Sequence, residues 1–308
     1  MTFAVAASRY FDEVGKFHSN SLETVRNLEW LSARVGKTTK VSAITDAVVA
    51  SAVAKRRGEG VGPATVNRTV CEPLRAILKR CAATWGQEVQ RVQWKTHFLK
   101  EPQERIREAS PDEEKALFAA IRGDYAPALR FAIISGCRRA EIVGLEWTAV
   151  DFFHKEITIH GKGDRKRVIP MTKEMYALLK QEHGNDPVHV FTYQSKRPPA
   201  GAKVGQRLPI TMEGFKTEWR RARKRSGVSD FRFHDTRHTA ATRILRKTGN
   251  LKHAQMLLGH TTIATTARYA HVKKDDLRAA MEAVSATEIA TEQGASGEII
   301  SENNGKVV

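Results

Sequence analysis

Residues 234–271 read H-D-T-R-H-T-A-A-T-R-I-L-R-K-T-G-N-L-K-H-A-Q-M-L-L-G-H-T-T-I-A-T-T-A-R-Y-A-H. The stretch sets His234, Arg237, His260 and Tyr269 in a fixed order. A phosphate under attack needs permanent cations with forked donors, imidazoles that carry protons and an oxygen nucleophile. All of these side-chain types are present. The rest of the sequence must then supply a second arginine, a proton donor and a surface for nucleic acid.

The composition is strongly basic. Among 308 residues, 51 Lys and Arg stand against 34 Asp and Glu, which gives a formal net charge of +17. Such an excess favours a polyanionic partner, because bound Lys and Arg release condensed counterions from phosphates. A soluble protein that is basic without binding nucleic acid is the alternative explanation. The length allows two domains, each with its own core.

Cysteines and apolar runs exclude several classes of protein. Cys71, Cys81 and Cys137 are odd in number and far apart, so neither a disulfide framework nor a zinc finger is expected. Residues 1–13 lack the basic and apolar regions of a signal peptide, and the longest apolar run, near 47–54, is too short to span a bilayer. We therefore expect a soluble intracellular protein in a reducing compartment.

Residues 1–108 are predicted to form a helical domain. Helices are expected from a capping sequence at Ser21, over residues 44–57, and from Pro63 onward. The apolar stripe of the third helix lies opposite a basic face, whose members are Arg68, Arg75, Lys79 and Arg80. Such a charged face is usually only solvated, but the total charge favours contact with phosphates.

A polar stretch over residues 100–109 is expected to be a linker, and a second domain is predicted over 109–284. Ser110-Pro111-Asp112-Glu113 is a strong helix start, with a capping serine, proline at the first helical position and acids in the first turn. Helices are expected over 113–121 and 125–135, with a short one anchored by Ile142 and Leu145. Residues 155–170 alternate in polarity around a glycine-rich turn, which predicts a β-hairpin.

The remaining segments complete a mainly α fold with a small antiparallel β-hairpin or sheet. Helices are predicted over 171–182, 212–225, 234–247 and 274–284, with a Pro/Gly/Lys-rich loop over 184–206. On the helix from 212, Phe215 and Trp219 should face inward, and its basic face includes Arg220 and Arg221 as candidate DNA contacts. Residues 285–308 lack an apolar period, so a flexible tail is expected, or a segment that orders against a partner.

A metal site is the alternative interpretation of the paired histidines. His234 and His238 have the spacing of two zinc ligands on one helix, but Asp235 stands where the usual glutamate is needed. Arg237 would add a fixed cation beside the metal. No metal is therefore predicted, and His238 is interpreted as a packing residue, whereas His234 and Arg237 can reach one spot from a shared helix face.

Five motifs occur in an order and spacing that resemble the tyrosine recombinases, the phage-integrase family of site-specific recombinases. They are G-C-R-R-A-E at 136–141, G-K-G-D-R-K-R at 161–167, H-D-T-R-H-T at 234–239, L-G-H at 258–260 and R-Y-A-H at 268–271. No single motif is decisive, but the presence of all five in this order is specific to the family. A weaker resemblance to the family's helical core-binding domain rests on T-V-N-R at 65–68 and the sequence after it.

The resemblance implies roles for seven residues. The catalytic ones are the arginines Arg138 and Arg237, the hairpin lysine Lys162, the histidines His234 and His260, and the nucleophile Tyr269, with Glu141 as a supporting acid. Arg138 is chosen over Arg139 because the glutamate stands three residues after it. The resemblance implies no metal and no cofactor.

The same resemblance implies cleavage and rejoining of DNA strands through a 3′-phosphotyrosine. It implies double-stranded DNA as partner, a homotetramer on that DNA, and no membrane partner, and it allows for accessory DNA-bending proteins. The setting would be the cytoplasm of a bacterium or phage-infected host, at the nucleoid. Leu277, Met281 and Val284 could dock on a neighbouring subunit or pack on their own domain.

Two other functions fit parts of the pattern. A type IB topoisomerase-like enzyme shares the chemistry but relaxes DNA alone. A recombinase-like protein that binds DNA without catalysis would be expected to lack some of the six catalytic positions, all of which are filled here.

Overall fold

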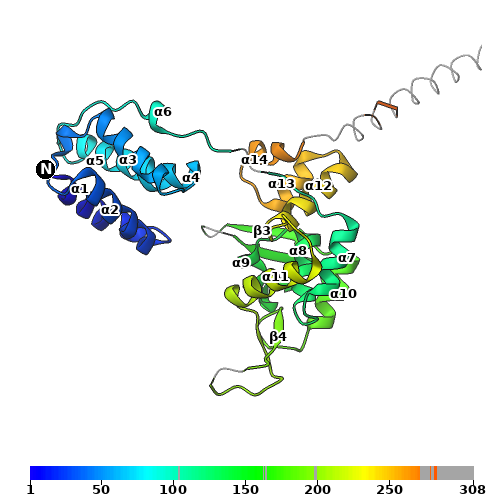
Figure 1. Cartoon of the computed structure of the whole chain (residues 1–308). Helices are drawn as coiled ribbons and strands as arrows, with labels where there is room; N and C mark the ends of the chain where they lie inside the picture. The colour runs from blue at the N-terminus through cyan, green and yellow to red at the C-terminus, as the bar shows by residue number, and fades with distance from the viewer. Residues whose placement is uncertain are drawn as a thin grey trace, which may run out of the picture. The chain divides into compact units, whose positions relative to one another are not determined.

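The structure is a computed structural model that describes residues 1–102, 105–161, 163, 165–197, 200–270, 278, 281 and 282. The chain divides into two compact units, Met1–Glu104 and Arg105–Val308, and each contains its own hydrophobic core (Figure 1). Within the described ranges, no helix combines the length and apolar character that crossing a bilayer requires. The expected tail, 285–308, lies outside the described residues.

The first unit is helical. Its helices are α1 (Phe3–Glu13), α2 (Ser21–Val35), α3 (Asp46–Gly58), α4 (Pro63–Val66), α5 (Glu72–Ala83) and α6 (Trp94–His97). The cap of α2 differs from the prediction, because Asn20 rather than Ser21 accepts the backbone N–H of Glu23, at 3.3 Å. Ser21 is already helical, so the capping position falls one residue earlier.

A single π-helical turn, Asn67–Cys71, joins α4 to α5 within the stretch predicted as one helix. Buried Asn67 uses this turn to bind the returning chain: its amide donates to the carbonyl of Leu99 and accepts from the N–H of Leu99, both at 2.9 Å. The turn thereby fixes residues 99–101 to the helical core.

The second unit contains eight α-helices among its described residues. They are α7 (Pro111–Ala120), α8 (Ala126–Ser135), α9 (Arg139–Val143), α10 (Lys173–Glu182), α11 (Met212–Ser226), α12 (Asp235–Thr248), α13 (Leu251–Leu258) and α14 (Ile263–Ala267). Ser110 caps α7 in a complete capping box with Glu113, as its sequence predicts. Phe215 and Trp219 are buried on α11, also as predicted.

Two small antiparallel sheets accompany these helices. β1 (Val150–Asp151), β2 (Glu156–His160) and β3 (Lys166–Pro170) form the first, with Ile157 paired to Ile169. The second consists of β4 (Thr192–Gln194) and β5 (Arg207–Pro209), whose residues fall partly in the loop expected over 184–206. These strands of three residues are too short to show alternation in the sequence. The predicted fold class, mainly α with small antiparallel β elements, is confirmed.

The expected linker over 100–109 is too long, because its second half belongs to the second unit. The guanidinium of Arg105 donates to the carboxylate of Asp235 at 3.0 Å. The buried N–H of Ala109 donates to the hydroxyl of Thr239 at 3.0 Å. Residues 105–109 are thus fixed to the beginning of α12.

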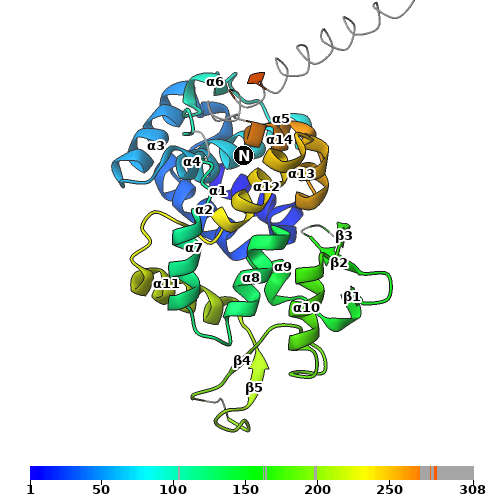
Figure 2. The ribbon, with the colours of Figure 1, turned by 90° about the vertical axis from the view of Figure 1, so that its right-hand side faces the viewer.

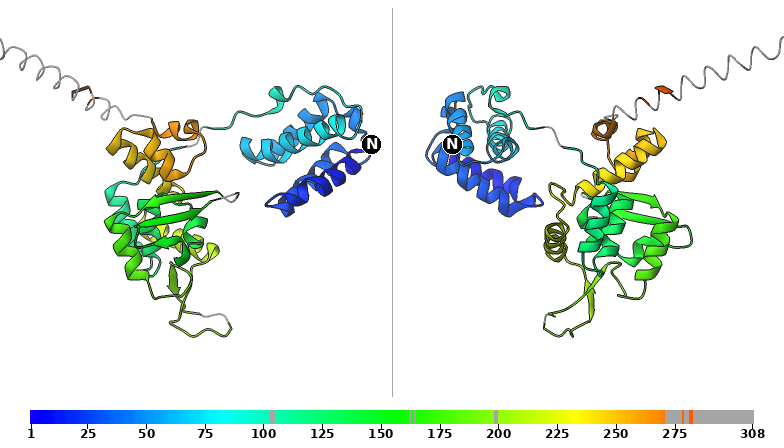
Figure 3. Two further views of the ribbon diagram at one scale, coloured as in Figure 1. Left: turned by 180° about the vertical axis from the view of Figure 1, so that it is seen from behind. Right: turned by 45° about the vertical axis from the view of Figure 1, so that its right-hand side comes forward.

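In the second unit, the 234–269 stretch packs against α8 and against β3 of the three-stranded sheet. In Figures 1 and 2, α12, α13 and α14 gather at one end of this unit, and β4 and β5 lie at the other. Figure 3 shows the same separation from two further sides. Contacts of α12 with α8 and of α13 with β3 join residues far apart in sequence.

Candidate active site

Arg138 and Glu141 come from the turn between α8 and α9. Gly136 ends α8 in the left-handed conformation at φ +61°, and Arg138 occupies the N-cap position of α9. The Glu141 carboxylate accepts the backbone N–H of Arg138 and its guanidinium Nη1, each at 2.8 Å. The Arg138 side chain is 44% exposed, so its cation is open to an approaching anion.

Arg167 of β3 binds the same carboxylate from the other side. Its Nη1 and Nη2 donate to the two oxygens of Glu141 at 3.0 and 2.8 Å. Burial alone would raise the pKa of Glu141, but the hydrogen bonds and charge of Arg167, and then of Arg138, lower this pKa to about 2. Glu141 is therefore a buried anion that fixes two arginines.

Arg167 also reaches the L-G-H motif. Its Nε donates to the carbonyl of Leu257 at 3.0 Å, and its Nη2 lies 3.5 Å from the Cys137 sulfur. A Cβ at Gly259 would lie only 2.6 Å from Cδ of Arg167, and Gly259 has φ +64°. Only glycine lets Arg167 pass so close to this turn.

The sequence prediction missed Arg167, although a signal was present. Arg167 has the same parity on β3 as buried Ile169, and Ile159 faces it across the sheet. In an alternating strand, a charged residue on the inward-facing side needs a buried partner. This requirement predicts a buried partner for Arg167, and therefore a structural role close to Lys162.

Arg237 lies in the first turn of α12 and is only 2% exposed. Its Nη1 donates to the carbonyl of Gly136 at 2.7 Å and its Nη2 to the carbonyl of Leu258 at 2.5 Å. Burial and the nearby cations Arg138 and Arg167 lower its pKa to about 10, which leaves it charged at neutral pH. These bonds use two of the five guanidinium N–H donors and join three motifs.

Tyr269 lies in a short 3₁₀ turn, Arg268–Ala270, just after α14, and is 5% exposed. Its hydroxyl is 2.9 Å from Nδ1 of His238, and the His260 ring lies nearly parallel to its ring at 6.4 Å between centroids. Burial raises the pKa of Tyr269, and the positive charges of Arg237, Arg268 and Arg138 oppose this rise. The cationic site therefore acts electrostatically on this phenol.

The two predicted histidines lie in different environments. His260 follows α13, and its Nδ1 is 2.9 Å from the hydroxyl of Thr266. Desolvation, and then Arg237 and Arg138, lower the pKa of His260 to about 4, so its ring is neutral at neutral pH. His234 occupies the N-cap position of α12 without a side-chain capping hydrogen bond, and its exposed ring has its centroid 5.0 Å from that of His238. Partial desolvation, and then Arg237, lower the pKa of His234.

Lys162 lies outside the described residues, so its role stays a prediction. The strands on either side of it pair up to His160 and Lys166. The N–H of Gly161 donates to the carbonyl of Arg165 at 2.6 Å, which closes the described base of the hairpin turn.

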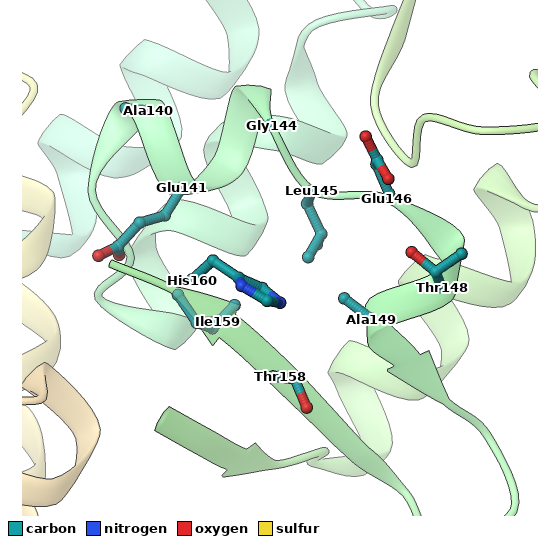
Figure 4. Close-up of a pocket in the computed structure, with 10 residues that line it drawn as sticks. All are labelled: Ala140, Glu141, Gly144, Leu145, Glu146, Thr148, Ala149, Thr158, Ile159 and His160. Atoms are coloured by element: carbon teal, nitrogen blue, oxygen red, sulfur yellow. The ribbon is translucent and has the colours of Figure 1, made fainter. Parts of the chain in front are cut away.

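A small cavity of about 250 Å³ lies beside the site, between α9, the turn at 147–149 and β2 (Figure 4). Glu141 is the one predicted site residue that lines it, and its carboxylate is drawn pointing away from the His160 ring. Arg138, Arg237 and Tyr269 do not line this cavity. The candidate chemistry therefore lies outside it.

The predicted DNA contacts differ in how free their charges are. Arg220 and Arg221 are exposed on α11. Arg75 and Lys79 are exposed on α5, where Arg75 lies over the ring of Phe98. The two remaining candidates are near acids: Arg80 donates to Glu13 at 3.0 Å, and Arg68 lies 4.0 Å from Glu101. Among the candidates in the first unit, Arg80 is thus the least available for contact with DNA.

Comparison with known proteins connects this geometry to one family. Residues 107–276 match the model of the phage integrase family. The integrase of Salmonella phage P22 is 30% identical over 211 residues, which cover 66% of this chain and 53% of that protein. The chain thus spans about half the length of the curated relatives it matches.

Solved structures share the fold. The Tn1549 transposon integrase in complex with a circular intermediate DNA has a TM-score of 0.71 at 19% identity, covering 92% of this chain and 99% of that chain. A lambda integrase tetramer bound to a Holliday junction has a TM-score of 0.66 at 17% identity, covering 85% and 78%. At these identities the likeness concerns the fold.

Proposed function

The chain belongs to the phage integrase family, and from this premise we propose that it is a site-specific DNA recombinase. It would cleave and rejoin DNA strands through a 3′-phosphotyrosine at Tyr269. One observation carries the proposal: the Arg237 guanidinium donates hydrogen bonds to the carbonyls of Gly136 and Leu258. These bonds connect the motif of Arg237 on α12 to the motif that contains Arg138 and to the motif that contains His260. Motifs separated by more than one hundred positions in the sequence thereby form one site.

Tyr269 is proposed as the nucleophile. A phenol with a pKa near 10 is ionised only to about one part in a thousand at neutral pH, so it needs a base or a cationic environment. Burial raises the pKa of Tyr269 overall, and the charges of Arg237 and Arg138 oppose this rise, so they are the cationic groups that would favour its ionisation. The Tyr269 oxygen would attack phosphorus, forming the Tyr–O–P bond as the P–O5′ bond breaks, and the phenol proton would pass to solvent with His234 or His260 as a shuttle.

Arg138 and Arg237 are proposed to bind the non-bridging oxygens of the phosphate. Forked donors aimed at the developing charge stabilise a pentacoordinate transition state most strongly when they are already oriented. Arg237 is oriented by its two carbonyl partners, and Arg138 by Glu141. Neutral His260 and His234 would complete the phosphate site by hydrogen bonding.

Lys162 is proposed as the general acid that protonates the leaving 5′-oxygen, on the resemblance of the hairpin motif alone. Religation reverses the step, with the 5′-hydroxyl attacking the phosphotyrosine and releasing the phenol. The phosphodiester bond energy is conserved, so the cycle needs no ATP, and two guanidinium groups can neutralise the phosphate without a metal ion.

Double-stranded DNA is the proposed partner, supported by the excess of cations and by exposed Arg75, Lys79, Arg220 and Arg221. A tetramer on DNA is proposed from the lambda integrase assembly on a Holliday junction. Of the expected docking stripe, Leu277 and Val284 lie outside the described residues. We also propose action at the nucleoid, in the cytoplasm of a bacterium or phage-infected host, where accessory DNA-bending proteins could assist.

Recombination between two DNA sites tests the proposed function. After the bound sequence is mapped by footprinting, the chain should recombine two copies of that site and form a covalent adduct on a nicked suicide substrate. Tyr269→Phe should bind the site with unchanged affinity and form no adduct. Tyr176→Phe, which changes a half-buried tyrosine on α10, is the matched control.

The outcomes distinguish the competing functions. Relaxation of supercoiled plasmid without joining of two sites would indicate a topoisomerase-like enzyme. Specific binding with no adduct would indicate a DNA-binding protein without catalysis. The names of the relatives, which are integrases, favour recombination over both.

A further inference from the structure

His238 is a buried histidine that the proposed mechanism leaves without a role. It follows Arg237 on α12 and is 2% exposed. Its Nδ1 lies 2.9 Å from the hydroxyl of Tyr269, and the two ring centroids are 5.5 Å apart. This is the hydrogen bond between the proposed nucleophile and a side chain of the helix that carries Arg237.

Burial and the charge around His238 keep its ring neutral, which allows Nδ1 to accept this hydrogen bond. Desolvation is the main reason that its pKa falls to about 4, and His234, Arg237 and Arg105 lower it further, against the opposing charge of Asp235. The ring is therefore neutral at neutral pH and has one nitrogen without a proton. Because Tyr269 stays protonated at that pH, its hydroxyl can donate to Nδ1 when the histidine proton is on Nε2.

We propose that His238 positions the Tyr269 hydroxyl for attack by accepting its hydrogen bond as a neutral imidazole, and that it is not the base for the phenol. The proposal rests on the proposed function of Tyr269 as nucleophile. It makes His238 a positioning residue that acts through Tyr269.

Acidities argue against proton transfer to His238. The pKa of Tyr269 is raised above 10.0, whereas that of His238 is about 4. Transfer from the phenol to this imidazole would therefore be strongly unfavourable, because a weak acid would protonate an even weaker base. An imidazolium would also lie beside Arg237, so the same cations that favour phenolate formation disfavour a charged His238.

Positioning matters here because Tyr269 lies in a short turn. The 3₁₀ turn Arg268–Ala270 is joined to α14, a helix of only five residues. The ring of Tyr269 packs against Ala241 and Leu258, apolar side chains that bury it but cannot hydrogen-bond to its oxygen. The stacked His260 ring restricts the plane of the phenol, and the bond to His238 fixes its oxygen.

Three substitutions of His238 distinguish a role as hydrogen-bond acceptor from a role as base and from a packing role. Asparagine can place its amide oxygen near the position of Nδ1, glutamine places its amide nearer to Nε2, and leucine fills volume without an acceptor. Single-turnover cleavage of a nicked suicide substrate is measured at saturating DNA, together with DNA affinity. Circular dichroism and thermal unfolding check that each variant folds.

His238→Asn should cleave within about threefold of the wild-type rate, because it retains an acceptor. His238→Gln and His238→Leu should cleave roughly 10- to 100-fold more slowly, the effect of losing one buried hydrogen bond. The affinity for DNA should be unchanged in all three. If His238→Leu does not fold, the comparison of asparagine with glutamine still decides the outcome.

A second readout needs neither DNA nor catalysis. Nitration of Tyr269 by tetranitromethane, followed by peptide mass spectrometry, should be slow in the wild type and several-fold faster in His238→Leu. Tyr125, which is 4% exposed and whose pKa is raised to about 12, is the internal reference. Its nitration should not change.

Three results would overturn the proposal. Equal loss of cleavage in His238→Asn and His238→Gln would indicate a titrating base or a packing role. Unchanged or faster cleavage in His238→Leu would show that the contact is dispensable or restraining, and unchanged Tyr269 nitration would show that the contact is absent in solution. Absence of any adduct from the wild-type protein would instead overturn the proposed function, and nitration would still test the contact.

Discussion

The cores of the two units differ in the kind of side chain that they bury. In Met1–Glu104 the described core is apolar, and its buried polar residues are Asn67, Thr69 and His97. The second unit buries charged residues as well, including Glu141, Glu218, Asp235 and Arg237. An unpaired buried charge is costly, so each of these needs a partner.

Burial of charge alone does not identify a functional site. Glu218 is paired with Arg225 at 2.5 Å, and Asp235 with Arg105 at 3.0 Å, and both pairs hold elements of the fold together. Glu141 and Arg237 differ because they belong to one network with exposed Arg138 and with a tyrosine. Buried charged residues therefore indicate a reactive site only where they surround a cation that solvent can reach.

The largest expected effect separates the two proposed catalytic arginines. Replacing either Arg138 or Arg237 by alanine should slow single-turnover cleavage by roughly 10²–10³-fold. Only Arg237→Ala should also lower the free energy of unfolding by about 2 kcal/mol or more, because it leaves two buried carbonyls without their donors. Arg138→Ala should change stability by less than about 1 kcal/mol, as urea unfolding would measure. A larger loss of stability for Arg138 than for Arg237 would contradict the contrast.

The next effect concerns Arg167. Arg167→Met removes the bidentate partner of Glu141 and should destabilise the second unit by about 3–5 kcal/mol, the usual result of breaking a buried ion pair. Cleavage by the folded fraction should fall about tenfold, since Arg138 loses a fixed carboxylate. Lys166→Met, which changes the exposed preceding residue on β3, is the control and should leave both quantities unchanged. Equal effects of the two changes would reject Arg167 as a support of the site.

These contacts also show the limit of reading the site from sequence. The alternating polarity over 155–170 predicts the hairpin, and the Ser110 cap predicts the start of α7, because both elements depend on residues close together in the sequence. The bond from Arg237 to Gly136 joins residues 101 positions apart, and only folding brings them together. The sequence neighbours of His238 are ordinary helix residues and predict a packing role, whereas its hydrogen-bond partner is in a turn 31 residues later.

Acid should weaken the second unit through His238. Its pKa is about 4 in the folded chain and 6.5 in an ordinary peptide, so the unfolded chain binds the proton first as pH falls. This contribution to stability is fully present above pH 6.5 and is lost between pH 6.5 and 4, by about 3 kcal/mol at most. Urea unfolding across this pH range should show a shallower loss in His238→Asn. An identical pH dependence in the variant would show that His238 is not protected from protonation.

The smallest effects are expected at the surface of the first unit. Lys79→Ala should weaken DNA binding and reduce the slope of log affinity against log salt by about one, without changing cleavage at saturating DNA. Arg80→Ala should change binding less, because Arg80 is already paired with Glu13. Titrations at several salt concentrations would compare them. A larger effect of Arg80 would mean that DNA displaces Glu13.

The covalent linkage between protein and DNA is the decisive test of Tyr269 as the nucleophile. The wild-type chain would be trapped on a nicked suicide substrate, digested with nuclease and protease, and the modified peptide sequenced by mass spectrometry. We expect a 3′-phosphonucleotide on the Tyr269 hydroxyl and on none of the other four of the chain's five tyrosines. A linkage at another residue, or cleaved DNA with no covalent peptide, would contradict it.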